Sequence, residues 1–184
     1  MRPPRTELTL TEWIVLALIG EGPTHGWAIA RALRPEGSLG AVWSCRAPLV
    51  YRAIRLLEGA ALVTSTGPAA GRGPSRTILG ITPAGNEAVG EWLMEPVDHV
   101  RDLRTELLVK LLLHERLGLD PSLLVRRQRD RLVPIATGLI DRVPAASGGE
   151  RMVVAWRAKT AQAALEFLGA IEATATGESE WLRR

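Results

Sequence analysis

The sequence has little cysteine, lysine and histidine, and each scarcity limits what the protein can be. Of its 184 residues only Cys45 is a cysteine, so an internal disulfide is excluded. The three histidines are scattered, and none lies in an H-E-x-x-H motif or at ligand spacing from Cys45, so we expect no metal site. We also expect no cofactor, because the chain has neither the G-K-[ST] of a P-loop nor a dinucleotide fingerprint.

Long hydrophobic runs are absent as well. The apolar stretch near the N-terminus is interrupted by Glu7 and Glu12, is too short to span a bilayer and has no A-x-A-like cleavage site. This argues against a signal peptide or membrane anchor. Together with the single cysteine, it leads us to expect a soluble protein of the reducing cytoplasm.

Catalytic patterns are also missing. The thiol of Cys45, beside Ser44, is the one nucleophile that stands out, and a small half-buried residue at a helix start is the favoured interpretation. No general base is placed beside a nucleophile, so we predict that the chain is not an enzyme. With 46% hydrophobic residues it can still bury a substantial core.

The most informative stretch is a helix predicted over residues 47–58. At the helical period its apolar residues gather on one side, namely Val50, Ala53, Ile54 and Leu57. The opposite side carries Pro48, Tyr51, Arg52 and Arg55. The first side suits a protein core, and the second suits a partner or solvent.

Basic charge is concentrated around this helix, although the whole chain carries a net charge of only +3. Between residues 44 and 82 a single acidic residue, Glu58, stands against the arginines Arg46, Arg52, Arg55, Arg72 and Arg76. A phosphate backbone is the partner that such a cluster favours. A merely solvated helix face is the alternative, and for Arg126, Arg127, Arg129 and Arg131 on a later helix the solvated interpretation is the preferred one.

The order of predicted elements is that of a winged helix-turn-helix. Helices are expected from Thr9 or Thr11 to Gly20, from about residue 24 to Leu33, and over residues 47–58. Strands over 62–66 and 76–81 flank a Gly- and Pro-rich loop, and Thr82-Pro83 opens a fourth helix that ends before Pro96. Residues 1–96 are therefore predicted to be a DNA-binding domain.

Residues 97–184 are predicted to be a helical dimerisation domain. One apolar stripe contains Leu103, Leu107, Leu108, Leu111 and Leu112, and another contains Met152, Trp156, Thr160, Ala163, Phe167 and Ile171. Asp120-Pro121 is expected to cap a helix between them. Such stripes can bundle, yet they leave apolar surface for a second copy of the chain. The fold class is thus mainly α with a small β-hairpin wing.

The tryptophans are expected to lie mostly in the core by their helical phase. Trp27, Trp92 and Trp156 are also candidates for lining a pocket that binds a small aromatic or apolar effector. His25 is expected to cap or pack at the start of the second helix.

Several segments together resemble the PadR-type transcriptional regulators of bacteria. The resemblance rests on His25-Gly26-Trp27, on residues 43–58, on Gly71-Arg72-Gly73-Pro74 to Arg76, and on residues 81–85 leading to Trp92-Leu93. It implies a dimeric winged-helix repressor that binds an inverted-repeat operator in double-stranded DNA and responds to a small molecule. Two residues depart from the family pattern. Ala61 stands where a glycine is usual, with Gly59 as a candidate for the turn, and Leu79 replaces an aromatic residue.

This interpretation assigns the DNA contacts. Arg46, Pro48, Tyr51, Arg52 and Arg55 are predicted to contact the major groove, and Arg72, Ser75 and Arg76 to contact phosphate or the minor groove. The alternative function is a protein-interaction adaptor, in which the same arginines meet an acidic protein surface.

Overall fold

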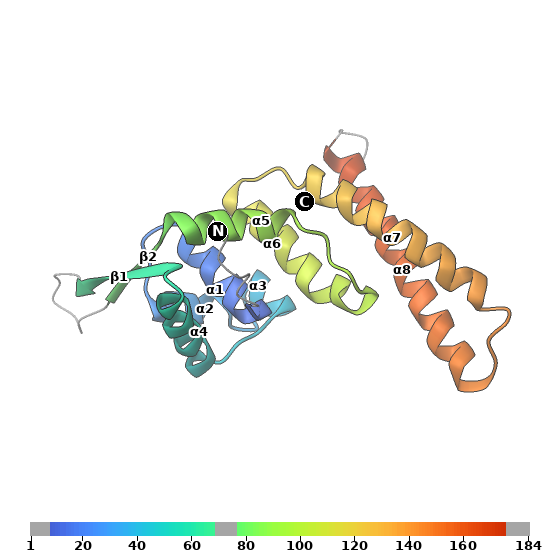
Figure 1. Cartoon of the computed structure of the whole chain (residues 1–184), viewed down its shortest axis with the longest axis horizontal. Helices are drawn as coiled ribbons and strands as arrows, with labels where there is room; N and C mark the ends of the chain where they lie inside the picture. Colours follow the sequence, from blue (N-terminus) through green and yellow to red (C-terminus); the bar gives the residue numbers. More distant parts are fainter. Residues whose placement is uncertain (1–7, 69–76, 176–184) are drawn as a thin grey trace. The chain divides into compact units, whose positions relative to one another are not determined.

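The computed structural model describes residues 8–68 and 77–175, and most of these are helical (Figure 1). The elements are α1 (Leu10–Gly20), α2 (Gly26–Ala32), α3 (Ser38–Val42), α4 (Ala47–Gly59), β1 (Val63–Pro68), β2 (Thr77–Ile81), α5 (Pro83–Met94), the 3₁₀ turn η1 (Val100–Asp102), the π-helical turn η2 (Leu103–Leu107), α6 (Leu108–Leu117), α7 (Ser122–Arg142) and α8 (Gly148–Ala175). The predicted fold class, helices with a two-stranded hairpin, is confirmed.

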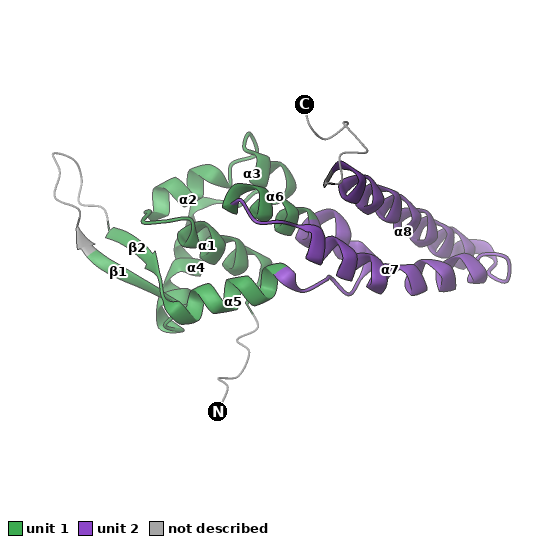
Figure 2. Cartoon of the chain, turned by 90° about the horizontal axis from the view of Figure 1, so that it is seen from above, with its two compact units in different colours: residues 1–93, 108–117 green, residues 94–107, 118–184 purple. Residues whose placement is uncertain are grey.

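The chain divides into two compact units, which Figure 2 shows in different colours. Unit 1 comprises residues 1–93 and 108–117, and unit 2 comprises residues 94–107 and 118–184. α6 therefore belongs to unit 1 although it follows Pro96 in the sequence. The division at residue 96 into a DNA-binding and a dimerisation domain stays a prediction.

Helix α1 is the centre of unit 1. Thr9 caps it, with the Thr9 side chain accepting from the Glu12 N–H while the Glu12 carboxylate accepts from the Thr9 N–H at 2.7 Å. This capping box satisfies two backbone donors at the helix start. The six residues from Ile14 to Ile19 are all buried, as an apolar helix without a polar face requires.

Between α2 and α4 lies a short helix that the sequence did not reveal. His25 is the N-cap of α2, and its Nδ1 accepts from the Ala28 N–H at 3.1 Å, which confirms the predicted capping role. α3 has five residues and no side-chain cap. Its Gly40 lies so close to the Arg34 carbonyl that an added Cβ would be 1.7 Å from the oxygen. Close backbone approach, rather than helix propensity, therefore requires this glycine.

The turn after α4 uses Ala61 rather than Gly59. Ala61 has a φ of 57°, whereas Gly59 remains in the helix. The Leu62 N–H donates to the Leu57 carbonyl and the Ala61 N–H to the Glu58 carbonyl, both at 3.0 Å. This is the Schellman arrangement, which normally places glycine in the left-handed position. Gly59, the candidate for the turn, therefore does not take it, and Ala61 carries the strain instead.

The hairpin pairs antiparallel with Val63 opposite Ile81 and Ser65 opposite Leu79, and its register shifts between Thr66 and Pro68. Leu79 is buried and exchanges two backbone hydrogen bonds with Thr24, at 2.8 and 3.3 Å. Leu79 thus anchors the hairpin to the segment before α2.

Thr82 connects the hairpin to α5. Its hydroxyl oxygen accepts from the Gly85 N–H at 3.0 Å and lies 2.9 Å from the Ala61 carbonyl, to which it donates. The predicted Thr82-Pro83 helix start is thereby confirmed.

The predicted leucine stripe over residues 103–112 is broken. Leu103 and Leu107 are buried in unit 2. The chain then passes into unit 1 as α6, and the buried apolar residues of this helix are Val109 and Leu113. The π-helical turn over 103–107 changes the helical phase, so a constant 3.6-residue period misplaces the later leucines. At the end of α6, Arg116 forms a bidentate pair with Glu21, two contacts of 2.7 Å, and this hydrogen bonding raises the pKa of Arg116.

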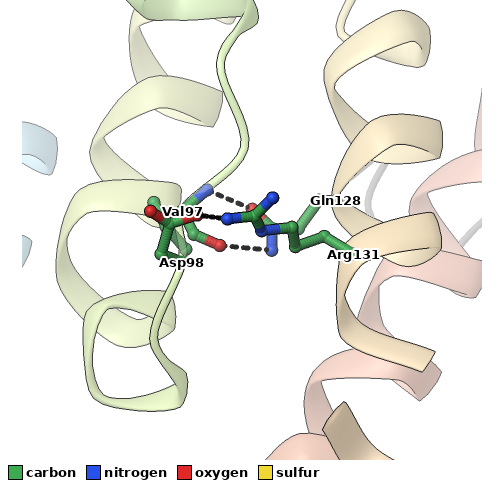
Figure 3. Close-up of polar contacts among 4 residues, drawn as sticks. All are labelled: Val97, Asp98, Gln128 and Arg131. Carbon is green, nitrogen blue, oxygen red and sulfur yellow. Dashed lines mark hydrogen bonds and ion pairs between the residues drawn. The ribbon is translucent and has the colours of Figure 1, made fainter. Parts of the chain in front are cut away.

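In unit 2, α7 holds the segment that follows α5 (Figure 3). The buried Gln128 accepts from the Val97 N–H at 2.8 Å and donates to the Val97 carbonyl at 3.1 Å. One turn along, Arg131 pairs with Asp98. The neighbouring Arg127 donates to the Met94 carbonyl at 3.1 Å. α7 therefore satisfies the backbone of a segment that has no regular structure of its own.

The remainder of unit 2 is the packing of α8 on α7, the two longest helices. The residues of α8 that face inward are Val154, Ala158, Ala161 and Leu168. Met152 and Trp156, predicted as part of the packing stripe, are instead 75% and 73% exposed. Alanines allow closer helix approach than the large side chains would, which accounts for the choice of face. At the start of α7, Asp120 accepts from the Ser122 N–H at 2.9 Å, as expected of a cap.

Candidate nucleic-acid interface

The two faces predicted for α4 are confirmed. Val50, Ala53, Ile54 and Leu57 are between 0% and 6% exposed. Pro48, Tyr51, Arg52 and Arg55 are all exposed, as is Arg46 at the N-cap. Pro48 lies in the first turn, where a missing N–H leaves no helical hydrogen bond unmade. The helix thus places its polar residues outward because the opposite side is committed to the core.

Two leucines also lie on the outer side of α4, and the sequence reasoning did not assign them to the site. Leu49 and Leu56 are 50% and 47% exposed. They are seven residues apart, so they share one flank of the helix beside Arg52. The site was predicted from the polar residues of this helix, and nothing in the sequence distinguishes an exposed leucine from a buried one.

Tyr51 is held against α2. A Cβ on Gly26 would lie 2.4 Å from the Tyr51 ring, so the ring rests on the backbone of α2 at this glycine. The ring nevertheless remains 44% exposed. Gly26 is therefore required by a close approach between two helices, and Tyr51 is fixed in place while it faces solvent.

The arginines of α4 and its N-cap differ from those of α7 in their ion-pair partners. Within the described part of the chain, Arg46, Arg52 and Arg55 have no ion-pair partner. By contrast, three arginines of the run on α7 are engaged: Arg127 with Met94, Arg129 with Glu172 and Arg131 with Asp98. These contacts favour a structural role for the three arginines of that run, whereas the arginines of α4 make no such contact among the described residues.

The hairpin stem follows α4, but the residues predicted at its tip are not described. Thr64 and Thr66 donate from their hydroxyls to the carbonyls of Gly80 and Ile78, both at 3.4 Å. Arg72, Ser75 and Arg76 lie outside the described residues. Their contacts with DNA stay a prediction.

The candidate pocket tryptophans lie in different surroundings. Trp92 is buried, stacks on Trp13 with ring centroids 5.3 Å apart, and has the Lys110 ammonium 4.9 Å from its ring. Trp27 is 51% exposed and has Arg31 over its ring. Trp156 is exposed on α8. The core position expected for Trp27 and Trp156 is wrong, whereas a pocket near these residues stays a prediction.

The thiol of Cys45 is a poor nucleophile. It is half-buried, and this burial raises the pKa of Cys45, an effect only partly opposed by a hydrogen bond with Thr11. A raised pKa disfavours the reactive thiolate.

Among residues 8–68 and 77–175 no three His, Cys, Asp or Glu side chains come together as metal ligands. In the same residues no helix has the length and apolarity needed to cross a membrane.

Residues 15–91, which include α4 and the hairpin, match the model of the transcriptional regulator PadR-like family. This part of the chain belongs to that family. The PadR-like match spans every element from α2 to β2 and most of α1 and α5. It confirms the family that the sequence motifs indicated. A family of transcriptional regulators is also consistent with the prediction that the chain is not an enzyme.

Solved structures similar to this chain include Bacillus subtilis PadR in complex with operator DNA, at 16% identity and a TM-score of 0.47, covering 90% of this chain and 99% of that chain. Bacillus subtilis PadR in complex with p-coumaric acid has 16% identity and a TM-score of 0.41, covering 93% and 98%. The protein smu.1604c of Streptococcus mutans UA159 has 15% identity and a TM-score of 0.42, covering 86% and 95%. No curated protein matches the chain.

Proposed function

We propose that this PadR-like protein is a sequence-specific DNA-binding repressor that binds an inverted-repeat operator as a homodimer and responds to a small-molecule effector. The observation that carries the proposal is the outer face of α4, on which Arg46, Arg52 and Arg55 are exposed without an ion-pair partner in the described part of the chain. A rigid helix with unpaired arginines fits the major groove of DNA in width and in charge.

On this proposal α4 reads base edges. Arg52 and Arg55 are one turn apart on the exposed face, and each can donate two hydrogen bonds to a guanine. Leu49 and Leu56 beside them supply apolar contacts suited to thymine methyl groups. Tyr51, braced on Gly26, is suited to a backbone or base contact of fixed geometry.

The hairpin would provide a second, less specific contact. Arg72, Ser75 and Arg76 continue from strands whose stem is fixed to unit 1 through Leu79 and Thr24. We propose that they contact phosphate or the minor groove. Such contacts add affinity and a salt dependence without reading sequence.

Residues 97–184 would serve to make the homodimer, and residues 1–96 to bind DNA. Met152, Val153 and Trp156 form an apolar surface on α8, and each is more than half exposed. A two-fold pair of chains that covers this surface would hold two copies of α4 in one geometry. The second half-site then binds at high effective concentration. Binding of chromosomal DNA implies that the protein acts in the cytoplasm.

The effector would be a small aromatic or apolar molecule bound near Trp27, Trp92 or Trp156, and the function needs no metal or cofactor. Basic groups beside two of these rings support an aromatic ligand: Arg31 lies 5.7 Å from the centroid of the Trp27 ring and Lys110 lies 4.9 Å from that of Trp92. A compound that occupies this site should quench tryptophan emission and weaken operator binding together. Quenching without a change in DNA affinity would separate the site from regulation.

Selection of bound sequences from a random DNA pool tests the function. We expect a palindrome, and we expect Arg52→Ala and Arg55→Ala to lose about 1–3 kcal/mol of discrimination between this operator and scrambled DNA. Arg126→Ala removes an exposed charge from α7 and should bind like the parent. If no sequence is selected and the protein captures an acidic protein surface through the same arginines, the adaptor function replaces this one.

Light scattering tests the dimer. Trp156→Glu should yield a monomer that binds a single half-site as the parent does but loses most of its affinity for the palindrome. Arg126→Glu is the matched control for an added acidic group outside the apolar surface. A parent that is monomeric in solution would contradict the proposal.

A further inference from the structure

Helix α2 carries an exposed tryptophan that core packing does not explain. Trp27 is 51% exposed, although tryptophan has the largest apolar surface of any side chain. It directly follows Gly26, the residue on which the ring of Tyr51 rests. Two exposed aromatic residues, one from each helix, are therefore tied to a single contact point between α2 and α4.

Arg31 extends over Trp27. The carbon at the centre of its guanidinium group is 5.7 Å from the centroid of the Trp27 ring, and the two residues are one helical turn apart. A guanidinium group over an aromatic face keeps its N–H donors in the plane of the group, free of the ring. Arg31 is exposed and, among the described residues, has no ion-pair partner. The indole thus holds an arginine in place without neutralising it.

The charge of the surrounding segment favours a polyanion as the partner. Residues 26–59 contain five basic residues, Arg31, Arg34, Arg46, Arg52 and Arg55, and two acidic ones, Glu36 and Glu58. All five arginines are exposed. α2 and α4 pack together, so the exposed arginine of α2 adds to the positive charge of the same pair of helices.

We propose that Trp27 and Arg31 form a contact to the sugar-phosphate backbone of the DNA at the edge of the groove that α4 enters. Arg31 binds a phosphate oxygen, and Trp27 both orients Arg31 and packs its exposed ring on the adjacent deoxyribose. The contact fixes how α4 enters the groove and reads no base. This inference rests on the proposed DNA-binding function, and it assigns Trp27 to DNA rather than to the effector.

The test uses the full-length protein with the selected operator and with scrambled DNA of the same length. Arg31→Ala should weaken binding to both DNAs by the same factor, about tenfold, and reduce the salt slope of the affinity by about one unit. Trp27→Ala should produce a similar loss. The double variant should lose less than the product of the two single losses, because Trp27 acts partly through Arg31. Arg31→Lys should keep the salt slope but lose part of the affinity.

Two further variants make the result decisive. Trp27→Phe keeps an aromatic ring, and it should retain more affinity than Trp27→Ala while abolishing the part of the fluorescence change on DNA binding that arises from Trp27. Arg52→Ala is the reference for base reading, and it should lose more affinity for the operator than for scrambled DNA. If Arg31→Ala and Trp27→Ala bind like the parent while Arg52→Ala loses operator binding, this inference is refuted and the proposed function stands. If the parent itself selects no DNA, both fail.

Discussion

The contact between Gln128 and Val97 predicts that one buried side chain maintains the segment after α5. Gln128→Leu keeps nearly the same volume and removes both hydrogen-bonding groups. The Val97 N–H and carbonyl, now bonded at 2.8 and 3.1 Å, would then be buried without partners. Each such group costs about 1–3 kcal/mol, and the leucine recovers part of this by its own burial. We expect unit 2 to lose about 2–4 kcal/mol of stability.

Arg131→Ala is the matched control from the same helix face (Figure 3). It removes the ion pair with Asp98, whose side chain is 60% exposed while that of Arg131 is 51% exposed. Water screens a pair this accessible, so its removal should change the stability by less than about 1 kcal/mol. The two variants thus compare a buried neutral contact with an exposed charged one, three residues apart.

Amide hydrogen exchange measures the effect where it arises. In Gln128→Leu the Val97 amide should lose protection by about 30-fold or more, which corresponds to about 2 kcal/mol. Arg131→Ala should leave this amide within a few-fold of the parent. Urea denaturation followed by circular dichroism gives the corresponding change for the unit. Equal protection of Val97 in parent and Gln128→Leu, or a larger loss in Arg131→Ala, would refute the reasoning.

Three further substitutions, with Gly90→Ala as a control, test unit 1 by thermal denaturation. Ala61→Gly should stabilise the protein by about 1 kcal/mol, because Ala61 occupies the left-handed region at a φ of 57°; an unchanged melting temperature would contradict this strain. Gly40→Ala should destabilise by about 1–3 kcal/mol because its Cβ would meet the Arg34 carbonyl, whereas Gly90→Ala on α5 has open space and should be neutral or stabilising. Thr82→Val should cost about 1 kcal/mol through loss of the Gly85 cap, and equal stability would show that water replaces the hydroxyl.

The sequence was sufficient for α4 because its pattern arises from one strong constraint. A helix that buries Val50 and Leu57 completely must expose the positions opposite, so the periodicity identifies both faces at once. Capping residues were similarly informative, since Thr9, His25 and Thr82 bond to backbone groups within three residues of themselves. Local interactions of this kind can be predicted from the sequence, because both partners lie close together in it.

Features that depend on distant contacts were not predictable in this way. α3 is a five-residue helix in which only glycine fits at position 40, because the Arg34 carbonyl is so close, and no period extends over so short a segment. The π-helical turn over 103–107 shifted the phase of the leucine stripe. On α8 the chain contains two usable apolar stripes, and the sequence does not say that the alanine-containing one packs on α7.

The ion-pair partners seen in the structure distinguish arginines that look alike in the sequence. Arg116 is occupied by Glu21, Arg129 by Glu172 and Arg131 by Asp98, so their charge is already used within the chain. Arg52 and Arg55 have no such partner among the described residues, and their exposed guanidinium groups keep their full capacity for an external anion. A net charge of +3 conceals this difference, because it counts both groups alike. The basic surface that matters for binding is therefore the one left over after folding, and in unit 1 it includes the outer side of α4.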